Sequence, residues 1–202
     1  MYTKTDICNL ALARLGDKRD IENIDNPTNQ PEKVFAKWYD ISRRAALRTM
    51  MPSFARTRKL WAKAEYTPEF GYAFAYKYRQ DCLKVLGIGN LNEPINDYAV
   101  EEGYVLTNQN YENGLPVRYV KDVTDINKFD DAFVELFSLM LAYNVAPELT
   151  ESRAIVQHLE QIIPIKTAQV IAVDSQENKP IIVKTSRLLA GRRGIQLREL
   201  KH

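Results

Sequence analysis

Cationic side chains gathered in two stretches are the groups in this sequence with the clearest chemical use. Residues 42–64 contain seven Lys and Arg and no Asp or Glu, and residues 175–202 contain seven Lys and Arg against two Glu. The rest of the chain carries −10, because the whole chain has a formal charge of +2. Concentrated positive charge binds phosphate groups or acidic protein surfaces. In the first stretch the candidates for DNA-facing or subunit-interface contacts are Arg43, Arg44, Arg48, Arg56, Arg58 and Lys59.

The same stretches also have a plainer interpretation. The first would be one solvated helix face followed by a loop, and the second a solubilising tail. The second stretch, however, carries apolar residues among its cations, which a generic disordered tail lacks. We therefore expect residues 175–202 to form an arm that lies on a partner. Its candidate contact residues are Lys184, Arg187, Leu188, Leu189, Arg192, Arg193, Ile195, Leu197 and Arg198.

Catalytic and metal-binding chemistry has few candidate residues in this chain. Two His and two Cys without repeated spacing argue against structural zinc, a disulfide framework and a His-dependent nucleophile. The adjacent carboxylates at 101–102 and 130–131 point apart in either a helix or a strand. No glycine-rich nucleotide-binding motif occurs. We expect no enzymatic activity, no metal and no cofactor.

The composition is that of an ordinary globular protein. The chain has 202 residues, 45% of them hydrophobic and 27% charged, which is enough to bury a core without disulfides or metal. It has no run of roughly 18 uninterrupted apolar residues and no secretory signal at its N-terminus. We expect a soluble protein made in a reducing cytoplasm, with no membrane partner.

Two helices are predicted in the first third of the chain. Thr3 and Thr5 are candidate caps for a short, buried helix that Gly16 ends. Asp, Asn and Pro residues then predict a loop over 17–31, and Pro31 suits the first turn of a second helix, which Pro52 ends. The face of this helix predicted to be apolar consists of Val34, Trp38, Ile41 and Ala45.

A strand pattern replaces the helical one from Phe70. Aromatic residues alternate with small or cationic ones over 70–79, so a strand would place them on one face. That face would pack on a core or, as the less favoured alternative, stack on bases. Further strands are predicted at 81–88 and 117–122. A hairpin joins 98–100 to 104–107, which gives one small antiparallel sheet inserted between helices.

Helical periodicity returns from Phe129 to about residue 144. Pro147 is expected to end this helix and Thr150 to start the next one, which runs past an expected kink at Pro164 to about residue 171. The predicted fold class is α+β. About four main helices form a helical core over 1–65 and 123–174, an antiparallel β region spans 66–122, and the basic C-terminal arm spans 175–202.

Four sequence blocks, in this order, resemble a known family. They are TDICNLALARLGD, WYDISRRAALRTMMPSFARTRKLW, GYAFAYKYRQDCLKVLGI and VRYVKDVTDINKFDDAFVELFSLMLAYNVAPELTES. Together they look like the head-to-tail adaptor family of tailed bacteriophages, also called tail tubular protein A. The resemblance covers roughly residues 5–174 and lies in the order of the blocks rather than in any single motif.

The resemblance implies a structural virion protein without catalysis. About twelve copies would form a ring below the portal protein, continue the channel for genomic DNA, and receive a downstream tail or nozzle protein. Family members reach the portal with a C-terminal extension, and the matching segment here is 176–202. The resemblance places the protein in the virion neck after synthesis in the host cytoplasm.

Two further functions stay open at this stage. A basic-armed nucleic-acid-binding protein would use Arg43, Arg44, Arg48 and the arginines of the arm to contact phosphates directly. A carbohydrate-active tail component would need a carboxylate pair that the sequence cannot identify.

Overall fold

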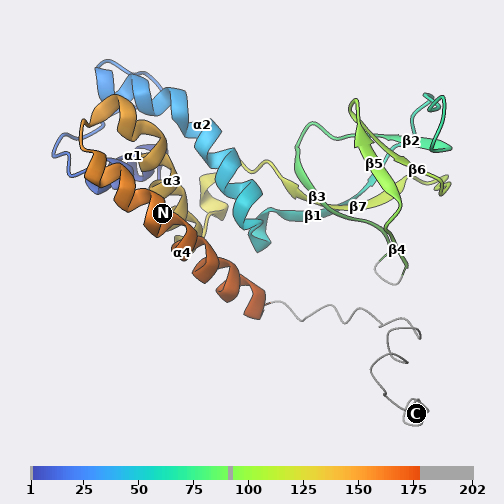
Figure 1. Ribbon diagram of the computed structural model, residues 1–202. Coiled ribbons are helices and arrows are strands. Elements are labelled where there is room, and N and C mark those ends of the chain that lie inside the picture. The colour runs from blue at the N-terminus through green and yellow to red at the C-terminus, as the bar shows by residue number, and fades with distance from the viewer. Residues whose placement is uncertain (1, 91–92, 178–202) are drawn as a thin grey trace, which may run out of the picture.

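The fold is α+β, as predicted, with four helices and two small antiparallel sheets. A computed structural model describes residues 2–90 and 93–177 (Figure 1). The helices pack together at one end of the molecule and the strands form a separate sandwich at the other. All nine arm residues named above lie outside the described residues.

Helix α1 (Lys4–Arg14) begins at a reciprocal cap. The Thr3 hydroxyl accepts the Asp6 amide at 3.1 Å, and the Asp6 carboxylate accepts the Thr3 amide at 2.8 Å. This arrangement satisfies two amides that the first turn would otherwise leave unpaired. The predicted cap at Thr3 and the predicted buried helix are confirmed.

Helix α2 (Gln30–Met50) begins with a second capping box, formed by Asn29 and Glu32. Its predicted apolar face is correct at Val34, which is buried, and wrong at Ile41, which is 54% exposed; Trp38 and Ala45 are partly buried. The buried residues that the prediction did not include are Phe35, Tyr39, Ala46, Leu47 and Met50, together with the polar Ser42 and Arg43. Both polar side chains have partners inside the fold, so polarity hid the true face of the helix.

Helix α3 (Asp131–Leu149) is the central helix and packs against α1, α2 and α4. The Asp130 carboxylate caps it by accepting the Phe133 amide at 2.7 Å. The helix is long and apolar enough to pass a membrane-span test by length and composition, but 56% of the tested window is buried inside the fold. These contacts are those of a core helix.

The predicted boundary between the last two helices is wrong. Helix α3 continues past Pro147 to Leu149, and Thr150 caps its end, with its amide donating to Ala146 O at 2.9 Å. Helix α4 (Arg153–Glu177) then passes through Pro164 and continues to Glu177, beyond its expected end near residue 171. A proline within the last turn of α3 removes one backbone donor without undoing the earlier turns.

The strands form two sheets rather than the single predicted one. Sheet A has the order β1 (Arg56–Trp61), β7 (Leu115–Lys121), β3 (Cys82–Asn90) and β4 (Glu93–Ile95). Sheet B has the order β2 (Phe74–Lys77), β6 (Tyr104–Thr107) and β5 (Tyr98–Glu101). All pairings are antiparallel, and the predicted hairpin that joins β5 to β6 is confirmed.

The two sheets enclose a core of their own. Trp61 and Tyr119 from sheet A and Tyr76 and Val105 from sheet B belong to one cluster of fully buried side chains. Side chains alternate across a strand, so the neighbours of these residues point outward from the sandwich. Because Tyr76 is completely buried, the predicted aromatic strand is part of this core and does not offer a base-stacking face.

Two predictions about the strands need correction. Strand β2 begins only at Phe74, and Phe70 is 87% exposed ahead of it. Strand β1 lies in a segment that was predicted to be a loop. Arg58 and Lys59 make that segment look like solvated chain, although charged side chains are common on edge strands because they discourage unwanted pairing.

Candidate functional site

Arg43 holds the helical core and the sandwich together. Its side chain is 4% exposed, and its guanidinium forms an ion pair with Asp122, which directly follows β7. The same guanidinium donates to Val123 O at 2.7 Å and to the Asp40 carboxylate at 3.1 Å. The prediction that Arg43 faces DNA or a second subunit is not supported, because its donors are used inside the fold.

Two more of the predicted cations also point to the protein itself. Arg44 is 57% exposed and lies 3.5 Å from the second oxygen of Asp122. Arg48 donates to Leu83 O at 3.1 Å. Both side chains therefore extend the junction between α2 and sheet A.

Arg56 ties the start of sheet A to the end of α4. Its guanidinium forms an ion pair with Asp174 and donates to Met51 O at 2.6 Å. The Asp174 carboxylate also accepts the Ser53 amide at 3.0 Å. The last described part of α4 is thereby fixed to the helical core three residues before the helix ends.

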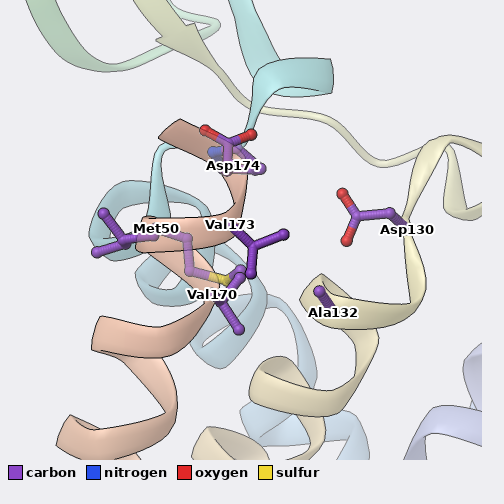
Figure 2. Close-up of a pocket in the computed structure, with 8 residues that line it drawn as sticks. Met50, Asp130, Ala132, Val170, Val173 and Asp174 are labelled. Carbon is purple, nitrogen blue, oxygen red and sulfur yellow. The ribbon is translucent and has the colours of Figure 1, made fainter. Parts of the chain in front are cut away.

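A groove lies beside this anchor. Figure 2 shows Val170 and Val173 of α4 facing the beginning of α3, where Asp130 and Ala132 lie. The groove has a volume of about 200 Å³. Its two carboxylates already have partners, since Asp130 caps α3 and Asp174 binds Arg56. Both carboxylates of the groove are therefore engaged in contacts that hold the fold.

The outer face of sheet A carries one of the two remaining predicted cations, Arg58. Arg58 on β1 is directly opposite Arg118 on β7, and Leu60 is opposite Pro116. Lys59, the residue between Arg58 and Leu60, is opposite the buried Val117 and so lies on the other face of β1, while Leu60 is 59% exposed. A hollow of about 370 Å³ lies over this face. Its lining residues are Arg58, Lys59, Leu60, Gly89, Asn90, Pro116, Val117 and Arg118.

Arg118 was missed by the sequence analysis. It lies in a part of the chain where acidic residues outnumber basic ones, so the charge of its segment does not reveal it. The alternation along β7 does, because Val117 and Tyr119 are buried and their neighbour must point outward. Its guanidinium lies over Gly87, where an added Cβ would be 3.7 Å from Nη2.

These surface cations are not neutralised within the described part of the chain. Arg58, Lys59 and Arg118 form no ion pair with any described residue. Like charges directly opposite each other in a sheet repel and destabilise the pairing. The Arg58–Arg118 pair therefore favours an anionic partner on this face.

No constellation for catalysis or metal binding is found in residues 2–90 and 93–177. These residues contain no cluster of three or more His, Cys, Asp or Glu placed to hold a metal ion. Burial raises the pKa of both the Cys8 and the Cys82 thiols, which favours the unreactive protonated form. The side chain of His158 is exposed on α4. The most strongly lowered carboxylate pKa belongs to Glu32, which caps α2.

No known family matches the sequence, and no curated protein matches it.

Proposed function

We propose that the protein is a head-to-tail adaptor of a tailed bacteriophage, a structural component of the virion without catalytic activity. Several copies form a ring between the portal protein and a downstream tail or nozzle protein, and DNA passes through its channel without sequence-specific contact. The segment 176–202 docks on the portal. The order of the four sequence blocks supports this proposal.

The observation that carries the proposal is the anchored end of α4, the helix that precedes the arm in the sequence. The arm follows a helix whose last turns are held by Arg56 and Ser53 through Asp174. A segment with a charge of +5 and apolar anchors thus begins at a fixed point of the body. Such a segment can cover a large partner surface, and its contribution is repeated by every copy in a ring.

Deletion of residues 176–202 tests the proposal. The truncated body is expected to fold, because Asp174 and its partners are retained, and to lose attachment to the portal ring. Attachment is measured by co-sedimentation with purified portal and by negative-stain imaging. A full-length variant with Arg192→Glu and Arg193→Glu is a second test that keeps the chain length, and weakened attachment is expected. Normal attachment by the truncated body would contradict the proposal.

A second candidate function rests on the unpaired cations of sheet A. Arg58, Lys59 and Arg118 surround one hollow and would fit phosphate groups. A protein that uses them for DNA binding loses duplex affinity steeply as salt is raised, with a slope that falls when Arg58 and Arg118 are replaced. An adaptor binds isolated duplex weakly at physiological salt.

A further inference from the structure

The outer face of sheet B is acidic and aromatic, in contrast to the outer face of sheet A. Glu101 on β5 is directly opposite Tyr104 on β6, and Glu102 follows in the turn between them. The ring of Tyr66 stacks on Tyr104 with centroids 5.0 Å apart. These residues and Leu106 line a hollow of about 150 Å³.

The charges on this second face are also unmatched. Glu101 and Glu102 are exposed and form no ion pair with a described residue. One cation, Lys77, is opposite Tyr104 on the other side of β6. Exposed aromatic surface lies beside the carboxylates, because Tyr66, which stacks on Tyr104, is 43% exposed.

The two faces complement each other in charge and in apolar surface. Sheet A offers Arg58 and Arg118 beside the exposed Leu60, and sheet B offers Glu101 and Glu102 beside the exposed Tyr66. Contact between them would relieve like-charge repulsion within each face and bury apolar side chains. Complementary charges also fix the orientation of two partners.

The faces cannot meet within one chain. Both sheets direct their inner side chains into the shared core around Trp61, Tyr76 and Tyr119, so Arg118 and Glu101 lie on opposite sides of the sandwich. Two different patches on opposite sides of one subunit produce a head-to-tail contact, which closes into a ring when the rotation permits.

We infer that the outer face of sheet A in one copy binds the outer face of sheet B in a second copy of this chain. Ring closure by this contact rests on the proposed adaptor function, whereas the contact itself follows from the two faces. A nucleic acid on sheet A would account for Arg58 and Arg118 but would leave the acidic face of sheet B without a role.

Charge exchange tests the contact. Arg58→Glu with Arg118→Glu makes both faces acidic, and Glu101→Lys with Glu102→Lys makes both faces basic. Each variant alone is expected to associate at least about tenfold more weakly than the unmodified chain. An equimolar mixture restores association, because each junction then joins opposite charges. A single chain with all four changes also associates with itself.

The readout is sedimentation velocity over a range of protein and salt concentrations. Lys33→Glu, an exposed change on α2, is the control for altered charge, and it leaves association unchanged. Thermal unfolding checks that the variants fold. The Arg58→Glu and Arg118→Glu variant is expected to fold, because two opposed Glu residues then replace two opposed Arg residues across β1 and β7.

Disulfide trapping gives an independent measurement. Leu60→Cys combined with Tyr66→Cys is expected to give a ladder of covalent oligomers on oxidation, while either change alone gives no ladder. The two native thiols are buried and do not compete.

Several outcomes would overturn the inference. They are unchanged association of the charge variants, failure of the mixture to associate, and a chain that stays monomeric and yields no ladder. Loss of duplex binding by the Arg58/Arg118 variant with unchanged self-association would assign the face to nucleic acid instead. Portal attachment is measured separately, so a failed adaptor function and a failed subunit contact give different results.

Discussion

Arg56, the first residue of β1, forms an ion pair with Asp174 near the end of α4, joining segments 118 residues apart in the chain. The same carboxylate accepts the Ser53 amide, so one side chain holds both the turn before β1 and the strand itself. The end of α4 is therefore positioned by sheet A as well as by its neighbouring helices.

Arg56→Ala is expected to loosen the last turns of α4. The two side chains are 31% and 15% exposed, and this partial exposure limits the cost to about 1 kcal/mol of unfolding free energy. Hydrogen exchange measures the effect as faster exchange of amides in residues 170–177. Arg58→Ala, on the same strand but without an ion-pair partner in the described chain, serves as the control and leaves these amides unchanged.

Arg43→Ala is expected to destabilise the protein by about 2–4 kcal/mol, because the change leaves the partly buried Asp122 carboxylate without its main partner. Arg44→Ala is the matched control. Arg44 contacts the same carboxylate from an exposed position, and its loss costs at most about 1 kcal/mol. Denaturant unfolding of both variants measures the difference. Equal costs would contradict the structural role assigned to Arg43.

Glu32 is expected to make stability depend on pH in the acid range. Hydrogen bonds from the amide of Thr28, and next from those of Asn29 and Glu22, lower its pKa from 4.5 to about 2. A lowered pKa adds stability that is present above pH 4.5 and is lost as the pH falls towards 2. Glu32→Gln should be less stable than the unmodified chain at pH 7, and the difference should shrink below pH 4.5.

Denaturant midpoints between pH 2 and pH 7 measure this dependence. Glu151→Gln, a change of an exposed side chain, controls for the loss of one negative charge. A difference between the Glu32 variant and the unmodified chain that stays constant with pH would contradict the role of the carboxylate.

Gly89 and Gly71 have the same positive φ of 86° but different surroundings. A Cβ on Gly89 would lie 2.7 Å from Glu93 O, while a Cβ on Gly71 would have no neighbour within 4 Å. Gly71→Ala is therefore expected to cost about 1 kcal/mol from backbone strain, and Gly89→Ala about 3 kcal/mol from strain and collision. Thermal unfolding compares the two. A similar loss in both variants would show that the backbone conformation alone decides the cost.

The features predicted correctly from the sequence are those that local interactions determine. The cap at Thr3, the hairpin around Gly103 and the apolar periodicity of α3 each depend on residues close together in the chain. The α+β fold class followed from the change of period near Phe70. These features need no knowledge of distant partners.

The errors arose where distant partners decide the outcome. The core face of α2 includes Ser42 and Arg43. The Ser42 hydroxyl accepts a hydrogen bond from the side-chain Nδ2 of Asn144 on α3 at 2.8 Å, and the partner of Arg43 is Asp122. Neither partner can be recognised from the sequence around α2. For the same reason the first basic stretch was treated as one surface, whereas its arginines divide between internal anchors and the outer face of sheet A.

The two arginine anchors have a mechanical consequence. The chain passes between the helices and the sandwich twice, before β1 and after β7, and Arg56 and Arg43 fasten these two crossings to α4 and α2. Each crossing is therefore tied to a helix by an ion pair. A movement of the sandwich that keeps both ion pairs intact therefore also moves the last part of α4.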